Sequence, residues 1–191
     1  GEQSVDDATK PAALDRFMTS LLKKGLSANY VNRIMSSGRA ALNRAWKKGL
    51  ITHAPYVPTT PVGDIPPKGR PLSLDEVRAL YHTTDYDYLK RFILWLVGTA
   101  ARPDAILELT TDQIDLEYGL VQLNPKGRRQ TKKYRPTVKL APTLRDHIGD
   151  GPWIIMSKGK PRKDVKYSWR KLRKALAFND EVVPYSLRHT M

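Results

Sequence analysis

A proline-rich segment from residue 55 to residue 71 sets the first limit on how this chain folds. It holds six prolines and two glycines. Proline lacks a backbone donor and fixes φ, so neither a helix nor a central strand runs through such a segment. We therefore expect an extended linker over residues 55–71, which separates a domain at residues 1–54 from a second domain at residues 72–191.

Hydrophobic periodicity predicts two helices in the first domain. The helix at 11–24 presents Leu14, Phe17, Met18, Leu21 and Leu22 on one face. The other runs from the N-cap Ser27 to about Lys48. Its predicted apolar stripe consists of Tyr30, Val31, Ile34, Met35, Ala41, Leu42, Ala45 and Trp46. Its opposite face carries the basic residues Arg33, Arg39, Arg44 and Lys47. Such a helix is suited to a nucleic-acid groove, although ordinary surface helices share the pattern.

The second domain is predicted to be mostly helical. Ser73 and Glu76 form a capping box that starts its first helix, and the apolar run 89–97 predicts its most deeply buried helix. Pro103 suits the first position of a short helix after that run. Further along, the pattern predicts two hairpin strands, a third strand and a long helix, at 120–123, 136–140, 153–156 and 162–177. The expected fold class is mainly α with a small antiparallel β-sheet (α+β).

Positive charge is concentrated in two parts of the chain, whose net charge is +14. Residues 16–52 hold eight Lys or Arg and no acidic residue, and residues 120–191 hold eighteen basic against five acidic residues. The intervening residues 53–119 carry a net charge of −4. Regions of one sign repel themselves unless a polyanion relieves them, which predicts a nucleic-acid partner.

Composition excludes several other classes of protein. The chain has no cysteine, so disulfides and thiolate metal sites are ruled out. Its carboxylates are too scattered to gather a two-metal nuclease site, and no glycine-rich phosphate loop is present. We therefore expect neither a metal nor any other cofactor. Because no long apolar run is present, we expect no membrane partner and a cytoplasmic, nucleoid-associated location.

Two arginines far apart in sequence each lie where a helix meets a turn. Arg102 follows the apolar run 89–97, and Arg188 lies in Tyr185-Ser-Leu-Arg-His-Thr190. Between them runs a basic hairpin over residues 124–139. Two guanidinium groups and a loop ammonium can bind one phosphodiester without a metal, because arginine donates paired hydrogen bonds to phosphate oxygens.

This arrangement resembles the tyrosine recombinases, the phage integrase family. Thr99-Ala-Ala-Arg102, followed by Ile106-Leu-Glu-Leu109, is similar to the first arginine box of the family, and residues 185–190 are similar to the second. The resemblance covers nearly the whole chain. It implies a partial core-binding (SAM-like helical) domain at residues 1–54 and a C-terminally truncated catalytic domain at residues 72–191.

The resemblance also implies roles for individual residues. Arg102 and Arg188 would bind the scissile phosphate, and Lys132 in the hairpin would be the general acid, with Lys133 and Lys126 as second choices. Tyr185, which stands where the family usually has a histidine, would be a further catalytic residue that hydrogen-bonds the phosphate or orients the nucleophile. His189 is a secondary candidate. The DNA-binding residues expected are Arg33, Arg39, Arg44, Lys47, Arg128 and Arg129.

Each of these assignments has a structural alternative. Arg102 would also suit the carboxyl end of the apolar helix, where a cation complements the helix dipole. Arg188 would equally pair with Asp104 or Glu108. Lys132 can be a plain phosphate contact, and His189 a hydrogen-bonded structural residue. Ala105 replaces a glutamate that is frequent in the family.

The function implied is site-specific recombination of double-stranded DNA through a 3′-phosphotyrosyl intermediate. The nucleophilic tyrosine of the family has no counterpart before Met191, so we expect residues 1–191 to bind DNA without cleaving it. The family tetramer on DNA is then expected only with the missing C-terminal segment, and the chain alone to be a monomer. The alternative is a non-catalytic, architectural DNA-binding protein on a recombinase scaffold.

Overall fold

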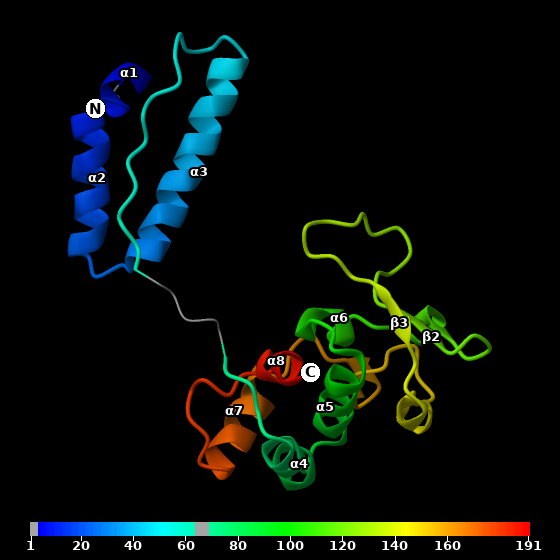
Figure 1. Ribbon diagram of the computed structural model, residues 1–191. Helices are drawn as coiled ribbons and strands as arrows, with labels where there is room; N and C mark the ends of the chain where they lie inside the picture. The colour runs from blue at the N-terminus through cyan, green and yellow to red at the C-terminus, as the bar shows by residue number, and fades with distance from the viewer. Residues whose placement is uncertain (1–3, 64–68) are drawn as a thin grey trace. The chain divides into compact units, whose positions relative to one another are not determined.

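The computed structural model describes residues 4–63 and 69–191 and has two compact units, residues 1–66 and 67–191 (Figure 1). Within the described ranges, no helix is long and apolar enough to cross a membrane. The mainly α architecture with small antiparallel sheets confirms the fold class predicted from the sequence.

The N-terminal unit is built on two helices that lie side by side, α2 (Pro11–Lys23) and α3 (Ala28–Lys47), with the single turn α1 (Val5–Ala8) before them. The predicted N-cap is confirmed, because the hydroxyl of Ser27 accepts a hydrogen bond from the backbone of Tyr30. The core of this unit consists of Leu21, Val31, Met35 and Val57.

The buried stripe of these helices is narrower than periodicity predicts. Phe17, Tyr30 and Trp46 are about half exposed, at 48%, 53% and 46% of their surface. Ala41 is also exposed. The reason is that α3 is covered by α2 and by one extended segment, residues 55–63, which shield less of its circumference than a full helical bundle would.

Residues 55–63 are extended, as their prolines require, but they lie along α3. The side chain of Asn32 exchanges two 2.8 Å hydrogen bonds with the backbone of Thr60. Arg39 donates to the carbonyl oxygen of Val57 at 2.7 Å, and the Val57 side chain is buried. These residues therefore pack within the N-terminal unit, whereas the sequence placed them in a free linker. Residues 64–68 of the predicted linker lie outside the described residues.

The C-terminal unit is organised around the buried helix α5 (Asp87–Thr99). Its Leu89, Phe92, Ile93, Trp95 and Leu96 are all buried, which confirms the prediction of a central helix. The other helices of this unit are α4 (Leu74–Thr83), α6 (Pro103–Leu107), α7 (Lys166–Ala175) and α8 (Ser186–Thr190). The predicted capping box of α4, formed by Ser73 and Glu76, is present.

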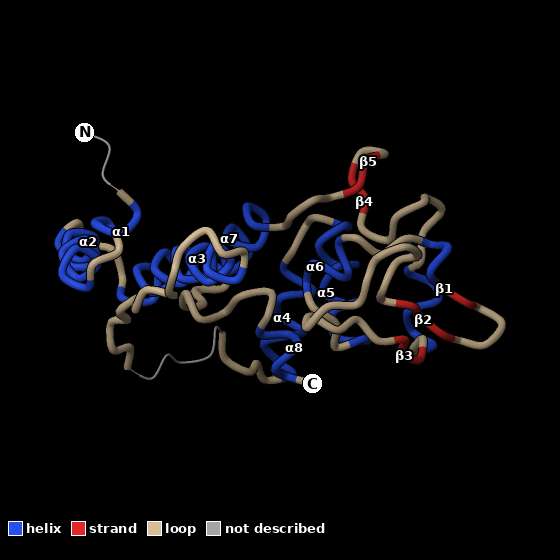
Figure 2. The backbone as a smooth tube through the Cα atoms, turned by 90° about the horizontal axis from the view of Figure 1, so that it is seen from above, coloured by secondary structure: helices blue, strands red, loops and turns tan. Residues whose placement is uncertain are grey.

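Two small antiparallel sheets complete this unit (Figure 2). The first has the order β1 (Ile114–Asp115), β2 (Leu120–Gln122) and β3 (Thr137–Lys139), with Val121 opposite Val138. The second pairs β4 (Met156–Ser157) with β5 (Lys160–Pro161). Two 3₁₀ turns, η1 (Thr111–Gln113) and η2 (Pro142–His147), connect these elements.

Two predicted elements are shorter in the structure. Residues 153–156 do not form one strand: Trp153 makes an isolated bridge to Thr110, and regular pairing starts only at Met156. The helix predicted at 162–177 begins at Lys166, where Asp164 accepts a hydrogen bond from the Lys166 backbone. It ends before Ala177, whose φ of 52° is left-handed.

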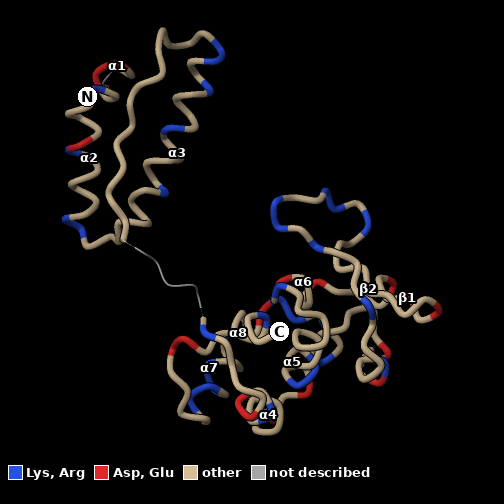
Figure 3. Tube along the Cα trace, viewed as in Figure 1, with Lys and Arg blue, Asp and Glu red and all other residues tan. Residues whose placement is uncertain are grey.

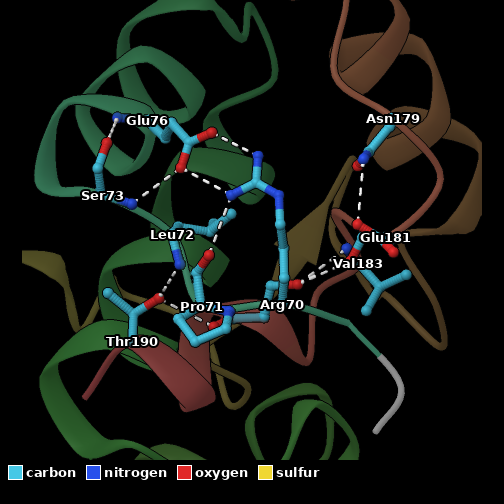
Figure 4. A network of polar contacts seen from close by, with 10 residues as sticks. Arg70, Pro71, Leu72, Ser73, Glu76, Asn179, Glu181, Val183 and Thr190 are labelled. Carbon is cyan, nitrogen blue, oxygen red and sulfur yellow. Dashed lines mark hydrogen bonds and ion pairs between the residues drawn. The ribbon is translucent and has the colours of Figure 1, made fainter. Parts of the chain in front are cut away.

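An ion pair fixes the start of the C-terminal unit (Figure 4). Arg70 donates two hydrogen bonds to the carboxylate of Glu76, at 2.9 and 2.5 Å, and the Ser73 backbone donates a third to it. Together the Arg70 guanidinium and the Ser73 amide hold the pKa of Glu76 at about 2, below its usual 4.5. We call residues 69–73 the strap.

This pKa predicts how acid affects the C-terminal unit. Since the folded-state pKa is depressed, ionised Glu76 stabilises the fold above about pH 4.5, and this contribution is lost as the pH falls toward 2. Thermal unfolding followed by circular dichroism from pH 6 to pH 2 is expected to show a smaller loss of Tm in Glu76→Gln than in wild type. Equal pH profiles for the two proteins would contradict the assigned role of the pair.

Candidate active site

Arg102 and Arg188 line the same pocket, although 86 positions separate them in the sequence. The pocket has a volume of about 180 Å³. Its wall consists of Thr99, Ala100, Ala101, Arg102, Ala105, Leu123, Tyr134, Arg135, Pro136 and Arg188. Three of these residues are arginines and none is acidic, so the pocket is suited to an anion.

Arg102 is placed by the end of α5. The helix stops at Thr99, and Ala100 takes a left-handed conformation with φ 49° and ψ 25°. The chain then turns so that Arg102 becomes the N-cap of α6, just before Pro103. The guanidinium of Arg102 donates to the carbonyl oxygen of Tyr134 at 2.6 Å. Arg102 is thus bonded across the pocket to the hairpin. The alternative role, a cation bonded to the carboxyl end of α5, is not the bond that the structure shows.

Arg188 approaches the same turn from α8. Its guanidinium donates to the carbonyl oxygen of Ala100 at 2.6 Å. The structure thus shows Arg188 bonded to a backbone carbonyl and not paired with Asp104 or Glu108, the alternative that the sequence left open. Because one guanidinium carries five N–H donors, a single backbone bond orients each arginine and leaves capacity for phosphate oxygens.

Arg135 is a pocket residue that the sequence analysis missed. Its side chain is only 9% exposed and donates to the carboxylate of Glu108 at 2.7 Å. In the sequence it is one of several basic residues of the hairpin, with no spacing that sets it apart. Ala105, where the family frequently has a glutamate, is a buried part of the wall and contributes no carboxylate.

The strap holds the short helix that carries Arg188. The backbone N–H of Leu72 donates to the hydroxyl of Thr190 at 2.9 Å, and that hydroxyl donates to the carbonyl oxygen of Ser186 (Figure 4). Gly69, with φ 89°, lies so close to α8 that an added Cβ would be 2.7 Å from the Ser186 hydroxyl. A helix of five residues cannot hold itself in place in water, so tertiary contacts such as these must fix it.

The predicted general acid and its two substitutes lie outside the pocket wall. Lys132, Lys133 and Lys126 are exposed on the long loop between β2 and β3, where Lys and Arg are dense (Figure 3). Arg128 donates to the side chain of Asn124 at 2.7 Å, and Arg129 is exposed on the same loop. The structure therefore brings the two arginines into one pocket wall and leaves the three lysines exposed on the loop, outside that wall.

Tyr185 and His189 lie beside the arginine pocket and not in its wall. Tyr185 lines a neighbouring pocket of about 460 Å³ together with Pro103, Asp104 and Lys163. The His189 ring meets the Tyr185 ring edge-on, with centroids 5.0 Å apart. Neither side chain is among the residues that line the arginine pocket.

The predicted DNA-binding residues of the N-terminal unit differ in their surroundings. Arg33, Arg44 and Lys47 are exposed on α3, whereas Arg39 is half-buried and bonded to the Val57 carbonyl. Among the residues that the structure describes, no group of three or more His, Asp or Glu side chains is placed to hold a metal ion.

A helical unit in which arginines from separate segments line one pocket has the form of a phosphate-binding site. Residues 70–191 match the phage integrase family, and because they make up most of the chain, the protein belongs to this family. A comparison with curated protein sequences gives no match.

Solved structures with a similar fold include two DNA-bound integrases. The integrase of transposon Tn1549, in complex with transposon right end DNA, aligns with 100% of this chain and 73% of its own at 19% identity and a TM-score of 0.75. A lambda integrase dimer bound to a COC′ core site aligns with 94% of this chain and 70% of its own at 18% identity and a TM-score of 0.68. A lambda integrase tetramer bound to a Holliday junction has a TM-score of 0.62 at 17% identity, with 94% of this chain and 57% of that chain covered.

The bond between the strap and α8 predicts the effect of a substitution at Thr190. Thr190→Val removes the acceptor of the Leu72 N–H and is expected to lower the free energy of unfolding by about 1–2 kcal/mol. Thr190→Ser keeps the hydroxyl and is the matched control. Urea unfolding of wild type and the two variants measures the effect. An equal loss of unfolding free energy in Thr190→Val and Thr190→Ser would show that the hydroxyl does not stabilise the fold.

Proposed function

We propose that the protein is a tyrosine-type site-specific recombinase that cleaves and rejoins double-stranded DNA at the arginine pocket. The observation that carries this proposal is the convergence of Arg102 and Arg188 on one pocket in a member of the phage integrase family. The similar folds of integrases solved with DNA support the same substrate.

The two arginines would neutralise the charge that builds on the phosphorane. Arg102 and Arg188 are each oriented by one backbone carbonyl, so little rearrangement is needed when a phosphate arrives. Such preorganised donors act most strongly on charge that develops in the transition state. Losing one charged donor raises the barrier by about 3 kcal/mol, which is roughly a hundredfold in rate.

A lysine of the β2–β3 loop would protonate the leaving oxygen. Lys132 is our first choice, with Lys133 and Lys126 next. The loop that carries all three leads into the pocket wall at Tyr134, so an incoming DNA strand over the pocket would meet these ammonium groups. Desolvation lowers the pKa of an ammonium group, so that it gives up its proton more readily, which suits a general acid.

Tyr185 would hydrogen-bond the phosphate or orient the nucleophile, and His189 is a secondary candidate beside it. Both belong to the segment that carries Arg188, and their rings are in edge-on contact. In this role Tyr185 hydrogen-bonds or orients a reacting group through its hydroxyl.

The nucleophile in this proposal is a tyrosine beyond Met191, and its attack gives a covalent 3′-phosphotyrosyl link that stores the energy of the phosphodiester. Residues 1–191 then form a partial core-binding domain and a partial catalytic domain, which together bind DNA without cleaving it. The exposed Arg33, Arg44 and Lys47 of α3, with Arg128 and Arg129 of the loop, would contact phosphates. Assembly as a tetramer on DNA belongs to the longer protein.

Phosphate contacts predict a steep salt dependence of DNA binding by residues 1–191. Arg129→Gln is expected to weaken binding to duplexes of unrelated sequence by a similar factor and to reduce the slope of log K against log salt by about 1. Fluorescence anisotropy at several salt concentrations measures this slope. Arg78→Gln, which removes an exposed arginine paired with Asp75 on α4, is the control and should leave the slope unchanged.

Covalent chemistry is tested in the longer protein that contains these residues and the tyrosine. Arg188→Ala is expected to reduce formation of the protein–DNA adduct about a hundredfold, while duplex binding falls much less. Adducts are counted on denaturing gels with a nicked substrate. Adduct formation at the wild-type rate would overturn the proposed role of Arg188, and the absence of any adduct in wild type would favour the architectural alternative.

A further inference from the structure

The end of the β2–β3 loop is closed by one glutamine. The side chain of Gln130 donates to the carbonyl oxygen of Arg135 at 2.9 Å and accepts from the backbone N–H of Arg135 at 3.3 Å. These two bonds copy the pairing of facing strand residues, and they enclose residues 131–134. The enclosed residues include Lys132 and Lys133, so the lysines lie on a small closed loop whose last residue borders Arg135.

The closing residue Arg135 is fastened to the C-terminal end of α6. Its side chain is 9% exposed, and its guanidinium donates to the carboxylate of Glu108, the C-cap of α6, whose side chain is 56% exposed. A nearly buried guanidinium requires a charged partner, because an unpaired charge in the interior is strongly unfavourable. Glu108 is the carboxylate that meets this requirement.

The N-terminal end of the same helix holds the residue before Arg135. Arg102, the N-cap of α6, donates to the carbonyl oxygen of Tyr134. The two ends of one short helix therefore bond two consecutive residues of the hairpin, with Arg102 on Tyr134 and Glu108 on Arg135. The strand pairing of the hairpin reaches Pro136, whose carbonyl oxygen accepts from the Leu123 backbone, so the two bonds to α6 are what hold the residues just before it. If the bond to Arg135 is lost, the Tyr134 carbonyl that orients Arg102 is free to shift.

We propose that the Glu108–Arg135 ion pair is a positioning device, which keeps Arg102 and the lysine loop in one fixed arrangement around the pocket. Glu108 and Arg135 are positioning residues: they act through the Tyr134 carbonyl and the Gln130 closure, and they do not themselves bind the phosphate. The inference rests on the proposed function for its consequence in catalysis. The arrangement that it describes exists in the free protein and is tested there.

A competing role for Arg135 is that of a third phosphate ligand, since it lines the pocket. The two roles differ in what a reversal of charge does. A positioning pair works in either orientation, so E108R/R135E should restore the arrangement that Glu108→Ala destroys. If Arg135 is only a phosphate ligand, Glu108→Ala leaves the ligand-free arrangement of Arg102 unchanged, and the charge reversal has nothing to restore.

The first measurement uses residues 1–191 without any ligand. The readout is the NMR signals of the Arg102 guanidinium, assigned by their loss in Arg102→Lys, and the rotation rate that they report. In wild type the bond to Tyr134 should slow this rotation. Glu108→Ala is expected to speed it by about fivefold, a typical coupling between groups of one contact network, and E108R/R135E to bring it back.

The matched control is Asp180→Ala. Asp180 is exposed and pairs with Arg173 of α7, which is 19% exposed, so this variant also removes an exposed carboxylate from a largely buried arginine. It is expected to lower the Tm in the same manner as Glu108→Ala but to leave the Arg102 signals unchanged. Arg102 rotation that is equal in wild type and Glu108→Ala, or equally altered by Asp180→Ala, would overturn the positioning role.

The second measurement adds inorganic phosphate and follows the signals of Arg102 and Arg188. Glu108→Ala is expected to weaken the Arg102 response about fivefold and to leave the Arg188 response within about twofold. A wild-type Arg102 response in Glu108→Ala, or an equal weakening of the Arg102 and Arg188 responses, would overturn the inference. No response of either arginine in wild type would count against the proposed function, while the ligand-free rotation rates would still decide the positioning role.

Discussion

The left-handed turn at Ala100 determines where both pocket arginines lie. An alanine with positive φ is strained by about 1–2 kcal/mol, and such a conformation persists only where the surroundings impose it. Here the buried helix α5 supplies that constraint, and Thr99 reinforces it by donating to the Trp95 carbonyl and accepting from the Ala101 backbone. The turn aims Arg102 into the pocket and presents the Ala100 carbonyl to Arg188. Arg102 and Arg188, far apart in sequence, are thus both positioned by the backbone of this one turn.

The remaining walls of the pocket depend on two further attachments. The hairpin is fastened to α6 through Tyr134 and Arg135, and α8 is fastened to the strap through Thr190. Neither the hairpin loop nor a five-residue helix has enough contacts of its own to keep a fixed position. Because the strap directly precedes α4 and follows the segment between the two units, the chain enters the C-terminal unit beside the helix that carries Arg188.

The sequence alone predicted those features that depend on local chemistry. Helical spacing of apolar residues located α2, α3 and α5, and the residue types at Ser27 and Ser73 located the N-caps of α3 and α4, because these signals need no distant partner. The order of two arginine boxes around a basic hairpin indicated the family, which the match over residues 70–191 confirms. Proline content correctly indicated an extended chain at 55–63, since it acts on the backbone itself.

Tertiary structure alone decided what those residues touch. No local pattern shows that Asn32 and Arg39 hold the extended segment against α3, or that Tyr30 and Trp46 remain half exposed. In the sequence Arg135 does not differ from the other basic residues of the hairpin. Its burial beside Glu108 is visible only in the structure. The sequence determined the charge and the elements of this protein; the folded chain decided which charges share a pocket, because a contact between residues 102 and 134 or 100 and 188 depends on packing over the whole unit.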